Sequence, residues 1–130
     1  MRVYDIKLWR LICVAVCACI AAGQASAHHS FAAFDTSQRL SVEGTVKELQ
    51  WANPHVWLEV IVVDKDGAQE EHSFEAFGMS VLKRAGWSRD TFKPGVKVTV
   101  EFSPFKDGRK GGQLLKVIRG DGVEFPLGRP

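Results

Sequence analysis

The fold is decided by residues 40–63, which read LSVEGTVKELQWANPHVWLEVIVV. Apolar and polar residues alternate from Leu40 to Val46, and the alternation then slips, because Leu49 is the next apolar residue. The slip follows Gly44, and a glycine followed by a change of period is typical of a strand that bends or carries a bulge. The pattern predicts a strongly bent first strand that begins near Leu40.

A second strand is predicted over residues 55–63, because Asn53-Pro54 interrupts the first one. Side chains alternate between the two faces of a strand, so its residues divide into two sets. The inner face is predicted to be aliphatic and to contain Val56, Leu58, Val60 and Val62. The outer face is predicted to contain His55, Trp57, Glu59 and Ile61.

A third strand is predicted over residues 69–77, after the turn signal Asp64-Lys65-Asp66-Gly67. Its Phe74 and Ala76 are expected to face the core. A short helix is predicted over residues 78–86, with Ser80 as its N-cap and Gly86 as the glycine that ends it.

Two further strands are predicted over residues 96–102 and 113–119, followed by a short edge strand over residues 123–125. Asp107-Gly108 and Gly111-Gly112 are expected to form the hairpin turn between the first two of these.

The order β-β-β-α-β-β predicts an all-β fold with one short helix. Five or six short strands with a bent first strand are typical of a small antiparallel barrel of the OB type, because closing a small barrel requires strongly coiled strands. An open antiparallel β-sandwich is the alternative.

The first 27 residues have the three parts of a secretory signal peptide. A basic start (Arg2, Lys7 and Arg10) precedes the apolar residues 11–22, and Ala25 and Ala27 satisfy the small-x-small rule for cleavage after Ala27. The apolar run of about 12 residues is shorter than the roughly 20 that span a bilayer. We expect export to the periplasm without a membrane anchor, a mature arm over residues 28–39 and one domain over residues 40–130.

Cleavage would change both the cysteine content and the charge of the chain. All three cysteines, Cys13, Cys17 and Cys19, lie in the leader, and a lipidated start at Cys19 is the competing route. The full chain has 17 basic and 15 acidic residues, and the mature chain would keep 14 of each. A neutral mature chain disfavours nucleic acid as a partner.

Four segments carry a resemblance to a family of small secreted bacterial proteins that is classed only as a domain of unknown function. They are AHHSFAAFD (27–35), VEGTVKELQWANPHVWLEV (42–60), LKRAGWSRDTFKPGVKVTV (82–100) and DGRKGGQLLKV (107–117). The resemblance covers nearly the whole mature chain. It implies an exported OB-like domain of a Gram-negative bacterium and no established activity.

The histidines are the best candidates for metal ligands. Cleavage after Ala27 would make His28 the terminal residue, so that its amine and its imidazole could chelate one metal ion, with His55 as a third nitrogen ligand and His29 as a substitute. Nitrogen ligands in tetragonal geometry favour Cu(II), and cleavage after Ser26 would also create a copper-type terminus. His72 is expected to lie at the rim of the core or on an exposed edge. A solvated or structural role for these histidines is the simpler alternative.

The remaining motifs point to binding rather than catalysis. Trp57, Trp51 and Glu59 are predicted to form an exposed aromatic face of the kind that OB barrels use for ligands. The mature chain contains no cysteine nucleophile, no nucleophile elbow and no His-Glu-x-x-His motif. The sequence therefore predicts a non-enzymatic periplasmic accessory protein that binds copper. The alternative is a metal-free module that docks a periplasmic or membrane-associated protein through its aromatic face.

Overall fold

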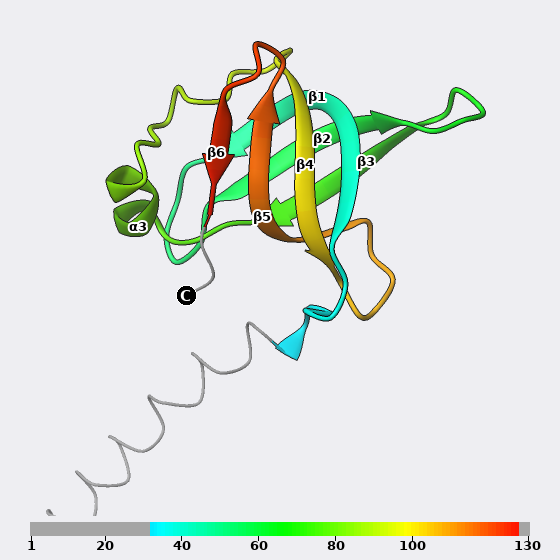
Figure 1. Cartoon of the computed structure of the whole chain (residues 1–130), viewed down its shortest axis with the longest axis horizontal. Helices are drawn as coiled ribbons and strands as arrows, with labels where there is room; N and C mark the ends of the chain where they lie inside the picture. The colour runs from blue at the N-terminus through cyan, green and yellow to red at the C-terminus, as the bar shows by residue number, and fades with distance from the viewer. Residues whose placement is uncertain (1–31, 128–130) are drawn as a thin grey trace, which may run out of the picture. The chain divides into compact units, whose positions relative to one another are not determined.

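The computed structural model describes residues 32–127, which contain six strands and one short helix (Figure 1). The elements, in chain order, are β1 (Leu40–Gln50), β2 (Trp57–Val63), β3 (Gln69–Glu75), α3 (Met79–Arg84), β4 (Lys97–Pro104), β5 (Gly111–Arg119) and β6 (Glu124–Pro126).

The strands form one sheet in the order β3-β2-β1-β4-β5-β6. All neighbours in that order are antiparallel, and an additional parallel pairing between β3 and β5 closes strands β1 to β5 into a barrel. β6 pairs with β5 outside this closed ring. The predicted OB-like barrel and its element order are confirmed, and the open sandwich is wrong.

β1 bends as its sequence predicts. Its first half pairs with β4, and from Thr45 onward it pairs with β2, with a register shift between Val46 and Glu48. At Gly44 a Cβ atom would lie 2.5 Å from Cγ1 of Val60 and 2.6 Å from the carbonyl oxygen of Ile61. Only glycine therefore allows β2 to approach β1 so closely at the bend.

The start of β5 also depends on glycine. A Cβ atom on Gly111 would collide with the carbonyl oxygen of Ser73 in β3, where the barrel closes, and one on Gly112 would collide with that of Ser103 in β4. The prediction that these two glycines form the hairpin turn was wrong, because they begin β5 and the turn precedes them. The close approach of a third strand, which sequence spacing does not reveal, is the reason.

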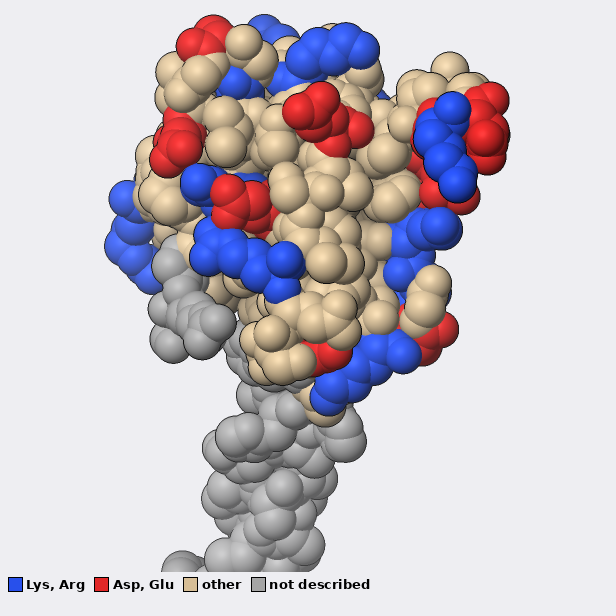
Figure 2. Space-filling model, turned by 45° about the vertical axis from the view of Figure 1, so that its right-hand side comes forward, with Lys and Arg blue, Asp and Glu red and all other residues tan. Residues whose placement is uncertain are grey.

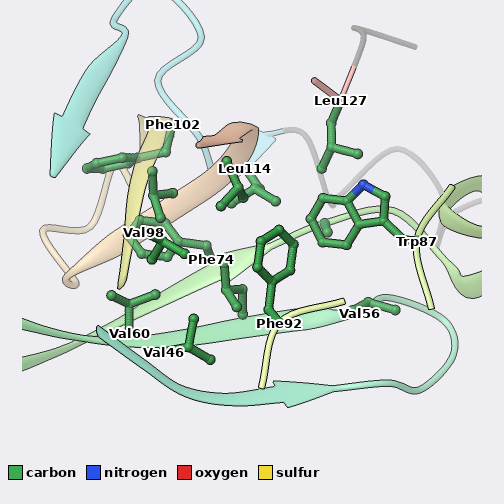
Figure 3. Packing of buried hydrophobic residues seen from close by; sticks show 14 of the residues in the cluster. Val46, Val56, Val60, Phe74, Trp87, Phe92, Val98, Phe102, Leu114 and Leu127 are labelled. Atoms are coloured by element: carbon green, nitrogen blue, oxygen red, sulfur yellow. The ribbon is translucent and has the colours of Figure 1, made fainter. Parts of the chain in front are cut away.

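The barrel is filled by aliphatic and aromatic side chains from every strand of the ring (Figure 3). Val56, Leu58 and Val60 of the predicted inner face are fully buried, and so is Phe74, while Ala76 is 6% exposed. Near α3, the rings of Trp87 and Phe92 meet edge to face with their centroids 4.9 Å apart. Each large apolar side chain buried in this way contributes about 1.5–3 kcal/mol, so this core is the main source of stability.

The helix α3 is shorter than predicted and begins differently. Its N-cap is Gly78 rather than Ser80, so the N-cap residue makes no side-chain bond to the first turn, and Asn53 Oδ1 accepts the Met79 N–H instead. Leu82 is its buried residue, which anchors the helix to the core. Gly86 follows the C-cap with φ of 86°, as expected for a glycine that ends a helix.

Several strand ends also differ from their predicted positions. β2 begins at Trp57 rather than at His55, and β3 ends at Glu75 rather than at residue 77. β4 runs from Lys97 to Pro104, later than predicted, because its pairing with β5 continues to Gly112.

The surface has no large area of one charge on the face drawn in Figure 2, where basic and acidic side chains lie beside each other. Lys116, for example, contacts both Glu101 (2.9 Å) and Glu124 (3.3 Å). Within residues 32–127, no helix is long and apolar enough to cross a membrane.

Candidate functional site

His55 lies immediately before β2 and is held by a neighbouring carboxylate. Its Nδ1 is 2.6 Å from Oε1 of Glu75, and its side chain is 36% exposed, whereas that of Glu75 is 13% exposed. A carboxylate that accepts a hydrogen bond from Nδ1 fixes the orientation of the imidazole ring and makes Nε2 the nitrogen that coordinates a ligand. His55 therefore has the geometry of a pre-oriented ligand residue.

The backbone on both sides of His55 is also fixed. Asn53 Oδ1 accepts a hydrogen bond from the backbone N–H of Met79 in α3 (3.2 Å). On the other side, Val56 exchanges two backbone hydrogen bonds with the end of β3: its N–H donates to the Phe77 carbonyl (3.1 Å), and its carbonyl accepts from the Ala76 N–H (2.8 Å). The loop that presents His55 is thus attached to α3 and to β3.

Glu75 was missed as a site residue in the sequence. It is the Cα partner of Trp57 across the β2–β3 hairpin, which places it beside the residue that starts β2. The turn signal at residues 64–67 contains the information to find it, because pairing outward from that turn brings residue 75 opposite residue 57. The sequence prediction did not include this pairing of residues 57 and 75.

The predicted aromatic face is only partly correct. Glu59 is 7% exposed rather than open to solvent, and its carboxylate accepts a hydrogen bond from the Ser73 hydroxyl. Alternation predicts the side of the sheet on which a residue lies but not its depth, and Glu59 is flanked by Glu48 of β1 and Ser73 of β3. Trp57 and Trp51 are half-buried, and Trp51 packs against the core.

His72 lies in β3 on the side of the sheet that faces the core, as Phe74 does. It is 7% exposed, and its Cα partner in β2 is Val60, an inner residue. Neither ring nitrogen has a hydrogen-bond partner within the described part of the chain. Nε2 lies 3.5 Å from Oε2 of Glu70, which is within ion-pair range but too loose for a good hydrogen bond. His72 and His55 do not share a partner, since His72 lies beside Glu70 and His55 beside Glu75.

Glu70 and Glu71, which precede His72 in β3, each form an ion pair with a lysine. The ammonium of Lys47 lies 2.7 Å from both carboxylate oxygens of Glu71, and this hydrogen bond raises the pKa of Lys47. At the β4–β5 turn, Lys110 lies 3.1 Å from Glu70, and Arg109 pairs with Asp107. Both of these ion pairs are exposed to solvent.

Residues 32–127 contain no group of three or more histidine, cysteine, aspartate and glutamate side chains that could hold a metal ion. His28 and His29 lie outside these residues, as do Ala25 and Ala27 of the predicted cleavage site. In the described part of the chain, His55 is therefore a single oriented imidazole with one neighbouring carboxylate.

Among the described residues before β1 (32–39), Phe34 is the one that is buried. It is 2% exposed, and its ring centroid is 5.1 Å from that of Phe105, which follows β4. The Asp35 N–H donates to the Pro104 carbonyl (2.8 Å). The end of the predicted arm is therefore anchored to the barrel at residues 34 and 35.

A comparison with protein families gives one match, to the model described as "Family of unknown function (DUF6152)", over residues 15–114. No curated protein and no solved structure matches the chain.

Proposed function

Because the chain belongs to the DUF6152 family of unknown function, we propose its role from the site itself: an exported, non-enzymatic accessory protein that binds copper in the periplasm through its processed N-terminus and His55. The observation that carries this proposal is the 2.6 Å contact between His55 Nδ1 and Glu75 Oε1.

That contact matters because it is the arrangement found around metal-binding histidines. Such histidines usually donate their second ring N–H to a carboxylate, which fixes the tautomer and raises the basicity of the coordinating nitrogen. The half-exposed position of His55 leaves its ring accessible to an ion.

Copper is favoured over other metals by the kind of ligands. The amine and imidazole of a terminal His28, with the imidazole of His55, would give three nitrogen donors, and His29 could replace one of them. Tetragonal nitrogen sites favour Cu(II), which also forms the most stable complexes in the divalent series.

The test requires the mature protein. We would purify it from the periplasm, establish its N-terminus by mass spectrometry and titrate it with Cu(II) while recording EPR spectra. We expect hyperfine coupling to several nitrogens and a loss of at least one of them in His55→Ala. The matched control is His72→Ala, which removes a histidine from the same hairpin and should leave the coupling unchanged.

A metal-free interaction module is the second candidate, and one observation favours it. Trp57, the Cα partner of Glu75, remains half-buried on the outer face although the core is already filled from the inner face of β2. A partner protein could cover this ring. Weak copper binding that is the same in wild type and His55→Ala, at an intact mature terminus, would reject the copper site and leave this module.

A further inference from the structure

A groove with a volume of about 550 Å³ lies on the outer side of the barrel, where β1 bends. Strands β1, β2, β4 and β5 line it, and none of its residues belongs to the copper proposal. The residues that matter for its chemistry are Glu43, Thr45, Ile61, Val63, Lys97 and Ile118. Its volume is within the range of small-molecule sites, roughly 300–1,000 Å³.

The groove contains one ammonium and one carboxylate that are not neutralised. Lys97 Nζ donates to Thr45 Oγ1 (2.7 Å), and within residues 32–127 neither Lys97 nor Glu43 takes part in an ion pair. The third charged residue of the groove, Arg119, is already paired with Asp121 (2.7 Å).

The register places these two charges at a useful separation. Lys97 is the Cα partner of Thr45, and Glu43 is the Cα partner of Thr99, so Lys97 and Glu43 are diagonal neighbours on adjacent strands. Diagonal neighbours in an antiparallel pair are about 7–8 Å apart. A ligand that meets both charges must therefore carry a negative and a positive group several ångströms apart.

Apolar side chains lie beside this charged pair. Val63 is 59% exposed, which is the highest value among the exposed large hydrophobic residues of the described chain. Ile61 and Ile118 are half-buried. An aliphatic group placed here would remove exposed apolar surface from water, at about 25 cal/mol per Å².

We propose that this groove binds a short zwitterionic peptide with aliphatic side chains, namely a dipeptide. Its terminal carboxylate bonds to Lys97, its terminal ammonium bonds to Glu43, and its side chains cover Val63, Ile61 or Ile118. A free amino acid fits less well, because a dipeptide separates its two charges by one further residue, about 3.6 Å, and fills more of the groove.

The test uses Leu-Leu as the probe, with the mature protein in EDTA so that metal plays no part. Binding is followed by calorimetry and by ¹H–¹⁵N NMR shifts at Thr45 and Val63. We expect Leu-Leu to bind, and N-acetyl-Leu-Leu and Leu-Leu-amide to bind about fivefold more weakly, as for the loss of one exposed charge contact of about 1 kcal/mol. Free leucine should also bind more weakly.

Variants assign each end of the peptide. Lys97→Met should abolish the preference for a free carboxylate, and Glu43→Gln the preference for a free ammonium. Lys93→Met and Glu48→Gln are the matched controls outside the groove and should bind Leu-Leu as the wild type does. The proposal is overturned if Leu-Leu does not bind, if the blocked peptides bind equally well, or if free leucine binds more tightly.

Discussion

His55 and His72 belong to one hairpin, and each lies beside a glutamate, but their surroundings differ in two respects. The His55 side chain is 36% exposed and has a 2.6 Å contact with Glu75, whereas the His72 side chain is 9% exposed and lies 3.5 Å from Glu70. Neither nitrogen of His72 has a hydrogen-bond partner in the described residues. A histidine that coordinates a ligand must be both oriented and accessible, and of these two described histidines His55 alone is both.

Substitutions at the two histidines should also affect different properties of the protein, namely its stability and its ligand binding. Changes at His72 should act on folding, because this residue of β3 is buried and lies opposite the core residue Val60 of β2. Changes at His55 should act on the proposed ligand binding, because its loop is already held by the Asn53 side chain on one side and by backbone hydrogen bonds of Val56 on the other. Substitutions at both histidines and at their neighbouring glutamates test this difference between folding and binding.

The largest difference should come from aspartate at each position. His72→Asp places a carboxylate in a buried site beside Glu70, so we expect a loss of about 3 kcal/mol or more in the free energy of unfolding. His55→Asp places it in a half-exposed loop and should cost less than about 1 kcal/mol. Urea denaturation followed by tryptophan fluorescence measures both, and similar losses would end the distinction between the two histidines.

The supporting carboxylates should differ in their effect on copper. Glu75→Gln should weaken Cu(II) binding about tenfold, since loss of a carboxylate behind a metal-binding imidazole typically costs 10–100-fold. Glu70→Gln is the matched control and should leave the affinity unchanged. Competition with a chelator of known affinity gives both constants, and an unchanged affinity in Glu75→Gln would remove Glu75 from the site.

Replacing His72 with leucine should stabilise the protein by about 1 kcal/mol. The substitution removes two buried nitrogens that lack hydrogen bonds and keeps an apolar side chain of similar size. Differential scanning calorimetry at neutral pH would show a higher Tm than in the wild type. A lower Tm would mean that the imidazole contributes more to the folded state than its surroundings indicate.

The smallest expected effect is on the pH dependence of stability, and it comes from the ion pairs of Glu101 with Arg39 and Lys116. A hydrogen bond from Lys116, and then one from Arg39, lowers the pKa of Glu101 below its ordinary value of 4.5. Because the folded-state pKa is lowered, this stabilisation is present above pH 4.5 and is lost as the pH falls through the folded pKa. Glu101→Gln should therefore reduce the pH dependence of the free energy of unfolding below pH 4.5 and leave that dependence at neutral pH unchanged. A change confined to pH 6–7 would contradict this assignment.

Much of the barrel could be predicted from the sequence, because it depends on local patterns. Alternation identified the inner face of β2, and Gly44 with the slip after it identified the bend of β1. What failed depends on neighbours that are distant in the sequence. Glu59 is covered by strands on both sides, and Gly111 and Gly112 allow β5 to approach β3 and β4 closely.

The candidate site also combines local signals with contacts between distant residues. His55 follows Asn53-Pro54, which is a local signal, and the structure places it in an oriented position. Glu75 required the register of the hairpin. His28 and His29 lie outside the described residues, so their role remains a prediction.

If copper binds at His55 and not at His72, as proposed, the NMR signals of the histidine rings should show the difference directly. Mature protein labelled with ¹³C and ¹⁵N in histidine would be titrated with less than one equivalent of Cu(II), and the ring ¹H–¹³C signals recorded. We predict that the His55 signals broaden beyond detection together with those of His28 or His29, while the His72 signals remain sharp. If the His55 signals remain sharp while only the terminal histidines broaden, the account is contradicted.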